Sequence, residues 1–379
     1  MSAPLHIGLM TGTSMDAVDA VALDAASVHV VACHSVPLPP ELRGELLAVD
    51  ADTPLAQVMA LDARMADVLA SAVSELVSTA GLDPTAIRAV GSHGQTVWHA
   101  PDAAPPGTLQ LGDPNRLAQQ TGFTVVADFR RRDIAAGGQG APLAPAFHQA
   151  FFADPAEDRV VVNIGGMANI TCLPARSQPD RVTGFDTGPG NALMDDWCRR
   201  HRGTAYDADG AWAAGGTVAD RLLDELLDAP YFQRTPPKST GRDAFNLDWL
   251  EAFGVAAYDP GDVQATLAEL TARTIADGVR ASLPGARRIL VCGGGARNSH
   301  LMGRLRVALP NCSVTATDGA GIPCQWVEAA GFAWLAAATL AGRPGNVPAV
   351  TGARTPVPLG GIYRGGVRGP DNEYSPLRK

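Results

Sequence analysis

The chain has no excess of basic residues. Its 379 residues include 30 Lys and Arg against 39 Asp and Glu, which gives a formal net charge of -9. Proteins that bind nucleic acid or an anionic membrane surface present a basic face. The charge balance therefore argues against both kinds of partner and excludes no other class.

Long apolar runs and paired cysteines are also scarce. The longest uncharged apolar run, residues 329–342, is shorter than the about 20 residues that a membrane-spanning helix needs. The N-terminus has no basic segment ahead of an apolar run, so we expect no signal peptide. The six cysteines show neither CxxC spacing nor a His at zinc-ligand spacing. We expect reduced, mostly buried thiols in a cytoplasmic protein.

Length and composition favour two domains. The sequence is 46% hydrophobic and 18% charged, so it can bury sizeable cores, and its 41 glycines indicate many tight loops. A domain typically takes about 100–200 residues. We predict an N-terminal domain of residues 1–129, joined by part of the C-terminal tail at roughly 350–379, and a second domain of residues 130–349.

The N-terminal part alternates short strands with helices. Residues 5–10, 18–23 and 28–32 have strand patterns so close together that they favour an antiparallel meander. Apolar residues recur at helical spacing over residues 55–79, and Gly81 ends that helix. Residues 129–140, with three arginines and three glycines, are interpreted as a linker or a functional loop.

The opening pattern recurs later in the chain. Residues 159–164 and 168–173 are strands joined by a glycine turn, like the strand, loop and strand of residues 5–23. This indicates either two similar domains or a coincidence, because β-hairpins are common. Strands and helices alternate in the rest of the sequence, which is typical of an α/β fold.

The first candidate loop is Thr11-Gly12-Thr13-Ser14-Met15-Asp16. Glycine lets backbone N–H groups approach an anion, Thr and Ser add hydroxyl donors, and Asp can hold Mg²⁺ through water. The loop is not a Walker A motif, because it lacks GK[ST] and no helix follows. A polar hairpin turn is the alternative interpretation.

The second candidate loop runs from Gly293 to Asn298, between an apolar strand and a helix. Its three glycines and a helix N-terminus suit contact with a nucleotide. A tight strand-to-helix turn explains the same residues.

Asp186 follows an apolar strand and opens a glycine-rich turn, where α/β proteins place ligands. Its carboxylate can accept a proton from an attacking nucleophile. Alternatively it is the N-cap of the helix that starts near Asn191.

Several other polar residues are candidates for ligand contact. His93 lies among glycines after a strand, which suits a hydroxyl-rich ligand or a satisfied loop histidine. Residues 130–132 are arginines that can bind a carboxylate or phosphate through forked hydrogen bonds, or form a solvated face. Glu328 begins an apolar helix, either as a helix-start acid or aimed at a substrate.

Taken together, these segments resemble the anhydro-N-acetylmuramic acid kinase family of actin/hexokinase-like ATPases. The matching segments, in chain order, are GLMTGTSMDAVDA (8–20), GSHGQTVWH (91–99), QLGDPNRLA (110–118), ADFRRRDIAAGGQGAPLAP (127–145), VNIGGMANIT (162–171), GFDTGPGNALMDDW (184–197), CGGGARN (292–298) and the Glu328 helix. Each is a weak signal alone, but together they cover nearly the whole chain.

The resemblance implies an α/β protein of two ribonuclease H-like (actin-like ATPase) domains with a nucleotide cleft between them. It implies a cytoplasmic, homodimeric enzyme that uses ATP and Mg²⁺. The enzyme opens 1,6-anhydro-N-acetylmuramic acid with water and releases the 6-phosphate, in cell-wall recycling.

It also implies roles for individual residues. Asp186 is the catalytic base, with an ordinary carboxyl pKa near about 4. Substrate contacts fall to His93, Gln95, Thr96, Arg130 and Glu328. ATP contacts fall to Thr11, Gly12, Thr13, Ser14, Met15, Asp16, Ala17, Val18, Asp19, Asn163, Gly165, Gly166, Gly293, Gly294, Gly295 and Asn298. No protein ligand for Mg²⁺ is certain, and Asp16 is the candidate.

One residue departs from the family pattern. Ala17 stands where the family usually has Gly, and a positive φ there would strain Ala by roughly 1 kcal/mol. We expect that Ala17 already lies on the second strand and costs little. Two other functions stay open: a kinase for another sugar, and a non-enzymatic ATP-binding module.

Overall fold

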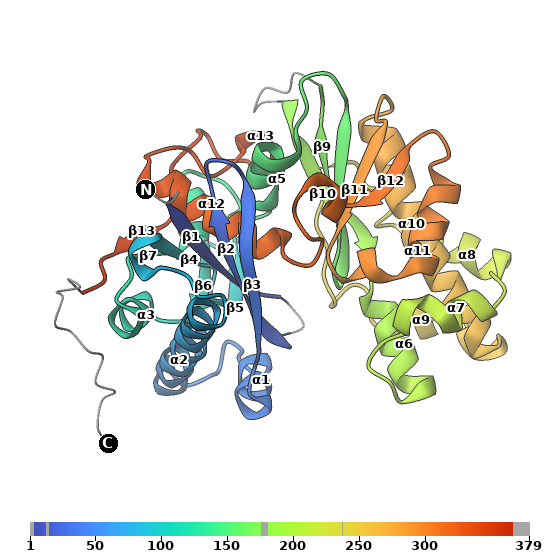
Figure 1. Ribbon diagram of the computed structural model, residues 1–379. Coiled ribbons are helices and arrows are strands. Elements are labelled where there is room, and N and C mark those ends of the chain that lie inside the picture. The colour runs from blue at the N-terminus through green and yellow to red at the C-terminus, as the bar shows by residue number, and fades with distance from the viewer. Residues whose placement is uncertain (1–3, 13–14, 176–180, 237, 367–379) are drawn as a thin grey trace. The chain divides into compact units, whose positions relative to one another are not determined.

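The computed structural model describes residues 4–12, 15–175, 181–236 and 238–366 (Figure 1). The chain divides into two compact units. Unit 1 contains residues 1–140, 328–345 and 356–379, and unit 2 contains residues 141–327 and 346–355. No helix in the described parts of the chain is long and apolar enough to span a membrane.

Unit 1 is built on a mixed sheet with the strand order β13-β7-β4-β1-β2-β3. Its strands are β1 (Leu5–Thr11), β2 (Ala17–Asp24), β3 (His29–Pro37), β4 (Ile87–Ser92), β7 (Val125–Ala127) and β13 (Gly361–Tyr363). β2 pairs antiparallel with β1 and β3, which confirms the predicted meander. β4 runs parallel to β1, and β7 runs parallel to β4.

Helices cover both faces of this sheet. They are α1 (Pro40–Leu47), α2 (Leu55–Thr79), α3 (Pro114–Thr121), α4 (Phe129–Ala135) and α12 (Val327–Leu340), with a 3₁₀ turn η1 (Pro84–Ala86) and a hairpin of β5 (Gln95–Ala100) and β6 (Gly107–Leu111). α2 has the predicted bounds, and its apolar stripe packs in one core with Ile7 and Leu9 of β1. The Cβ position of Gly8, between them, is on the opposite face of the sheet, because successive Cβ atoms alternate along a strand.

That opposite face is covered by α12, which lies directly on the strand backbones. A Cβ atom on Gly8 would overlap the carbonyl of Ala329, and one on Gly91 of β4 would overlap the carbonyl of Phe332. Only glycine leaves room for this approach. The helix therefore rests on β1 and β4 through two positions that cannot carry a side chain.

Unit 2 repeats the same sheet. Its strands are β8 (Arg159–Ile164), β9 (Met167–Leu173), β10 (Thr183–Pro189), β11 (Arg288–Cys292) and β12 (Ser313–Ala316), in the order β10-β9-β8-β11-β12. β9 pairs antiparallel with β8 and β10, while β11 runs parallel to β8 and β12 to β11. In both units the second of the first five strands alone runs opposite to the other four, and unit 1 adds β13 as a sixth strand, antiparallel to β7. This order and direction define the ribonuclease H-like fold, so the predicted fold class is confirmed.

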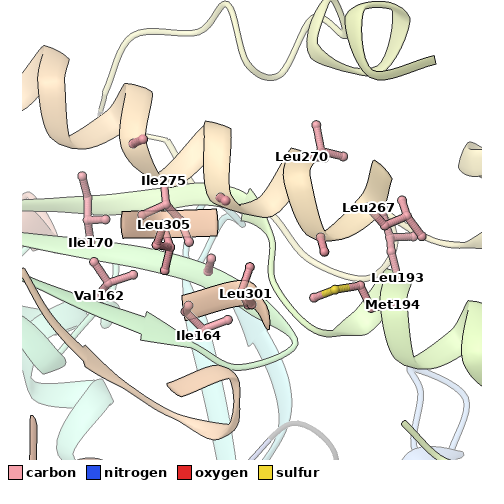
Figure 2. Packing of buried hydrophobic residues seen from close by; sticks show 14 of the residues in the cluster. Val162, Ile164, Ile170, Leu193, Met194, Leu267, Leu270, Ile275, Leu301 and Leu305 are labelled. Carbon is pink, nitrogen blue, oxygen red and sulfur yellow. The ribbon is translucent and has the colours of Figure 1, made fainter. Parts of the chain in front are cut away.

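Helices enclose the second core. They are α5 (Ala144–Phe152), α6 (Ala192–Arg202), α7 (Ala211–Gly215), α8 (Asp220–Leu227), α9 (Leu247–Glu251), α10 (Pro260–Ser282), α11 (Ser299–Ala308) and α13 (Pro348–Thr351), with 3₁₀ turns η3 (Ala208–Gly210), η4 (Val255–Ala257), η5 (Gly294–Arg297) and η6 (Thr317–Ala320). Figure 2 shows side chains of this core, which includes Val162 and Ile170 of the sheet, Leu267 and Ile275 of α10, and Leu301 of α11.

The units differ from the predicted domains in residues 130–140 and 328–345, which the prediction placed in the second domain, and in residues 350–355, which it placed with the first. Part of the first segment was also predicted to be a loop and instead forms helix α4. Asp133 accepts a hydrogen bond from the Gly140 N–H at 2.7 Å, so the chain after α4 folds back onto it. α12 belongs to unit 1 because Gly8 and Gly91 receive it.

We predict that Gly8→Ala destabilises the protein by about 3 kcal/mol or more, since the added methyl group meets backbone atoms that cannot rotate away. Thermal unfolding should begin about 5 °C or more below that of the parent protein. Gly107→Ala is the matched control, because nothing lies within 4 Å of its Cβ position. Equal melting temperatures for the two variants would contradict the packing of α12 on β1.

Candidate functional site

The β1–β2 turn is the first predicted phosphate loop. Thr11 ends β1 with its hydroxyl buried and without a partner among the described residues. The Met15 N–H donates to the Gly12 carbonyl at 3.0 Å, and Met15 has a φ of 52°. A turn that buries an unpaired hydroxyl and forces a positive φ is built for more than chain reversal. Thr13 and Ser14 lie outside the described residues.

Ala17 lies where we expected it. It is the first residue of β2 and pairs with Pro37 of β3. It is not among the described residues with positive φ, so alanine causes no strain there. The prediction for Ala17 is confirmed, and the strained residue of this turn is Met15.

The residues that follow the turn differ in their accessibility. Asp16 is exposed and forms an ion pair with Arg43 at 3.3 Å, so its carboxylate is open to solvent. The carboxylate of Asp19 accepts a hydrogen bond from Ser35 at 2.8 Å, and burial raises its pKa. Val18 is fully buried in the core of unit 1. Only its backbone can therefore contact a ligand.

His93 and Arg130 form a buried pair at the end of β4. The Arg130 Nε and Nη2 atoms lie 3.1 and 2.9 Å from His93 Nε2, and His93 Nδ1 lies 2.8 Å from the Gly94 carbonyl. A guanidinium only donates hydrogen bonds, so Nε2 is the acceptor and Nδ1 carries the proton. Burial and the Arg130 charge hold the pKa of His93 well below its ordinary value. The histidine is therefore neutral.

Arg130 keeps capacity for a ligand. Its Nη1 donates to the Gly140 carbonyl at 2.8 Å, in addition to the two contacts with His93. A guanidinium has five N–H donors, so donors remain for an anion. Burial lowers the Arg130 pKa to about 10, against the opposing charge of Glu328, and the side chain stays cationic at neutral pH.

Glu328 joins this group from the start of α12. Burial raises its pKa, the Arg130 charge opposes that rise, and the Asp19 charge adds to it. Phe332, one turn along the helix, packs its ring 4.8 Å from the His93 ring. The structure thus brings His93, Arg130 and Glu328 together, and all three were predicted to bind substrate.

The remaining predicted substrate residues lie on β5. Gln95 donates to the Thr96 carbonyl at 3.1 Å, and Gln110 donates to the Thr96 hydroxyl at 3.2 Å. The Gln95 Oε1 atom is buried without a partner among the described residues. An unpaired buried acceptor costs about 1–3 kcal/mol, so a donor from a ligand would stabilise Gln95 Oε1.

Asp186 lies on the edge strand β10 of unit 2, next to a register shift between Asp186 and Gly188. Its carboxylate Oδ2 accepts a hydrogen bond from the Thr240 N–H at 3.0 Å. Burial raises the pKa of Asp186 to about 6, and the Thr240 bond opposes that rise. Asp186 is therefore a stronger base than an aspartate with the ordinary pKa of about 4, which we expected. It is not a helix N-cap, since that position belongs to Asn191.

The glycine loop after β11 lies against the end of β8. Gly293 has a φ of 80°, and a Cβ there would overlap the side-chain oxygen of Asn163. That oxygen is buried without a partner among the described residues. Asn298 caps α11, because its side chain accepts a hydrogen bond from the Leu301 N–H at 2.9 Å. Asn163 and Gly293 thus share one loop cluster, whereas Asn298 already has a structural role.

Sequence reasoning missed the segment after α8. Lys238 and Thr240 contact Asp186 through the backbone. Arg242 lies next to the predicted Gly165–Gly166 turn, with its Nε and Nη2 atoms 3.7 Å from the Cβ position of Gly166. The composition Lys-Ser-Thr-Gly-Arg of residues 238–242 was the available signal. The sequence did not predict a functional loop at these residues because no strand precedes them.

The chain is similar over nearly its whole length to known proteins. The family model described as "Anhydro-N-acetylmuramic acid kinase" matches residues 4–365. A curated protein of that name from Xanthomonas axonopodis pv. citri (strain 306) is 49% identical over 372 residues, covering 96% of this chain and 99% of the relative. One from Coxiella burnetii (strain RSA 493 / Nine Mile phase I) is 48% identical, covering 95% and 97%.

The chain belongs to the anhydro-N-acetylmuramic acid kinase family. The resemblance drawn from the sequence motifs is confirmed, and with it the prediction of an enzyme of the kinase class. Membership of a kinase family implies ATP as donor and a sugar as acceptor. The individual site residues and the homodimer stay predictions.

The described residues of this family member suit ATP and Mg²⁺. Two of the buried atoms without a partner among the described residues, Thr11 Oγ1 in unit 1 and Asn163 Oδ1 in unit 2, lie at the ends of β1 and β8, where the predicted glycine loops begin. No cluster of three or more His, Cys, Asp or Glu that could hold a metal occurs among the described residues. The exposed carboxylate of Asp16 is the predicted contact for Mg²⁺, which proteins usually hold through phosphates, water and one or two carboxylates.

We predict that His93 stays neutral through about pH 5 to 8, as the Nδ1-protonated tautomer. Arg130→Met removes a charge that lowers the His93 pKa, so the imidazole should then titrate closer to its ordinary pKa of about 6.5. ¹⁵N NMR of histidine-labelled protein measures both states. A wild-type His93 signal that titrates near pH 6.5 would contradict the assigned hydrogen bonds.

Proposed function

We propose that this chain is a cytoplasmic, homodimeric kinase that uses ATP and Mg²⁺ to convert 1,6-anhydro-N-acetylmuramic acid into N-acetylmuramic acid 6-phosphate, in peptidoglycan recycling. The observation that carries the proposal is Asp186, a buried carboxylate of raised pKa in a chain of this kinase family. A protein that only binds nucleotide needs no such base.

Asp186 acts as the general base. It accepts a proton from the water that attacks C1 of the sugar, and the C1–O6 bond breaks. The electron pair of that bond stays on O6, which attacks the γ-phosphorus and displaces ADP. With a pKa of about 6, the carboxyl group is mostly ionised at neutral pH and has a proton affinity close to the operating pH. This resembles an inverting glycosidase, with phosphoryl transfer in place of protonation of the leaving oxygen.

The unit 1 group binds the sugar. Arg130 offers its remaining N–H donors to the lactyl carboxylate of the muramic acid, in a forked contact that a guanidinium favours. His93 keeps Arg130 in place by accepting two of its hydrogen bonds. Glu328, Gln95 and Thr96 present acceptors and donors to sugar hydroxyl groups.

The glycine loops bind the nucleotide. Thr11, Gly12 and the residues up to Asp19 would hold the β- and γ-phosphates, and Asp16 would hold Mg²⁺ through water. Asn163, Gly165, Gly166 and Gly293 to Asn298 hold the nucleoside side. Bound Mg²⁺ supplies neutralisation of the phosphate charge during transfer. Arg242 lies beside Gly166 and adds a cation to this loop cluster.

We predict that Asp186→Asn lowers kcat by about 10²–10⁴-fold, because the amide cannot accept the water proton. ATP affinity, measured by calorimetry, should stay within about twofold, since Asp186 lies outside the predicted nucleotide loops. Asp243→Asn is the matched control, an exposed carboxylate three residues after Thr240, the residue that contacts Asp186. Full activity of the Asp186 variant would remove this residue from the mechanism.

We predict that reaction in H₂¹⁸O places the label at C1 of the product sugar and none on the phosphate. This outcome follows because water attacks carbon while O6 carries the phosphoryl group. Mass spectrometry of the separated sugar and phosphate locates the label. Label on phosphate would contradict the coupled mechanism. Phosphorylation of ordinary hexoses in place of the anhydro sugar would favour a kinase for another sugar.

A further inference from the structure

Asp186 is held almost entirely by one segment of the chain, residues 231–240. The Tyr231 hydroxyl donates to the Asp186 carbonyl at 2.6 Å. The Asp186 N–H donates to the Lys238 carbonyl at 3.2 Å, and the Thr240 N–H donates to Asp186 Oδ2 at 3.0 Å. Asp186 has four polar atoms: its N–H, its carbonyl oxygen, Oδ1 and Oδ2. Of these, Oδ1 alone has no hydrogen-bond partner among the described residues.

This segment replaces a neighbouring strand. β10 is the edge of the unit 2 sheet, so one side of it has no strand to pair with. Lys238 satisfies the exposed N–H at the position of the base. The register shift after Asp186 leaves Thr187 out of the ladder, and its hydroxyl donates to the Ala168 carbonyl at 3.2 Å. Asp186 therefore has a fixed backbone although it lies at a sheet edge.

An aromatic cluster anchors the segment. The Phe245 ring, which is 2% exposed, lies 5.4 Å from the Tyr231 ring and 5.6 Å from the Phe232 ring. Phe232 in turn lies against the backbone of Gly188, whose φ is 148° and whose Cβ position is 2.7 Å from the Phe232 Cε1 atom. The segment is thus tied to β10 at both ends of the bulge.

We propose that Tyr231 and the backbone N–H of Thr240 are positioning groups that fix the Asp186 carboxylate, so that Oδ1 accepts the proton from water while Oδ2 is held by the protein. This inference depends on the proposed function for its kinetic consequences, but not for its structural ones. The Tyr231 bond fixes the backbone of the base. The Thr240 bond fixes its side chain and stabilises the ionised form.

The hydrogen bond from the Thr240 N–H lowers the pKa of Asp186 and so favours its ionised form, against the effect of burial. Burial and the Asp186 charge raise the pKa of Tyr231, so it stays a neutral donor. The Lys238 ammonium lies over the Tyr231 and Phe185 rings, at 4.9 and 5.8 Å, and burial lowers its pKa. Arg234 lies over the Tyr231 ring at 5.9 Å.

The other elements on β10 add no charge to Asp186. α13 has no titratable residue. The α10 residues Glu269 and Arg273 pair with each other, as do Asp277 and Arg280. On β9 the residue opposite Asp186 is Asn169.

The test compares Thr240→Pro with Thr240→Ala. Both lose the hydroxyl, but only proline lacks the N–H. Loss of a hydrogen bond to the carboxylate raises the pKa of the base. As the pH is lowered, the base is then protonated, and activity lost, at a higher pH than in the parent enzyme. The acid limb of kcat/KM, expected near about pH 6 for the parent, should lie about one pH unit higher in the proline variant than in the alanine variant. Coincident limbs would overturn the proposal.

A second variant covers the case in which proline prevents folding. Tyr231→Phe keeps the ring in the aromatic cluster and removes the donor to the Asp186 carbonyl. We expect kcat to fall about fivefold to tenfold with an unchanged KM for ATP. A kcat within twofold of the parent enzyme would count against Tyr231 as a positioning residue, and so against the proposal.

An infrared titration separates failure of this inference from failure of the proposed function. The carboxyl band of Asp186, identified by difference from Asp186→Asn, reports its pKa without substrate. A higher pKa in Thr240→Pro than in Thr240→Ala supports the positioning role even if the anhydro sugar is not turned over. Equal pKa values in an enzyme that is active on the sugar reject the positioning role and leave the proposed function intact.

Discussion

The contact of helix α12 with the backbones of β1 and β4 determines the arrangement of unit 1. Gly8 and Gly91 allow the helix to touch both strands. β1 leads into the predicted phosphate turn, β4 leads into His93, and α12 begins at Glu328. Three segments that are far apart in sequence thus meet at one contact, and each carries predicted site residues at its end. Phe332 of α12 also packs against the ring of His93, which accepts hydrogen bonds from Arg130.

Unit 2 uses the same sheet for a different purpose. Its β8–β9 turn corresponds to the predicted phosphate turn of unit 1, and its edge strand β10 carries Asp186, the predicted base. Buried polar atoms without partners are found in both units, on Thr11 and Asn163. Binding sites are one of the places where folded proteins keep such atoms, so both are consistent with the predicted nucleotide loops. The duplicated fold therefore provides two glycine loops, and each unit adds its own side chains for chemistry or recognition.

Much of this was readable from the sequence, because periodicity and motif order report local structure directly. The bounds of α2 and the β1–β3 meander follow from apolar spacing, and the family follows from ordered motifs. Contacts between distant segments were not readable. α4 was predicted as a loop because its arginines show no apolar period, and the bond between Asp133 and Gly140 that closes it has no sequence signal. The raised pKa of Asp186 and its contact with Thr240 likewise depend on tertiary burial.

The discontinuity of unit 1 has a consequence for biosynthesis. Domains generally fold as units during synthesis, starting from the N-terminus. Here the first unit to emerge waits for α12, whose residues 328–345 come after nearly all of unit 2. Until then Gly8 and Gly91 lie on an uncovered apolar face. Nearly all of unit 2 is therefore synthesised before α12 can cover that face of unit 1.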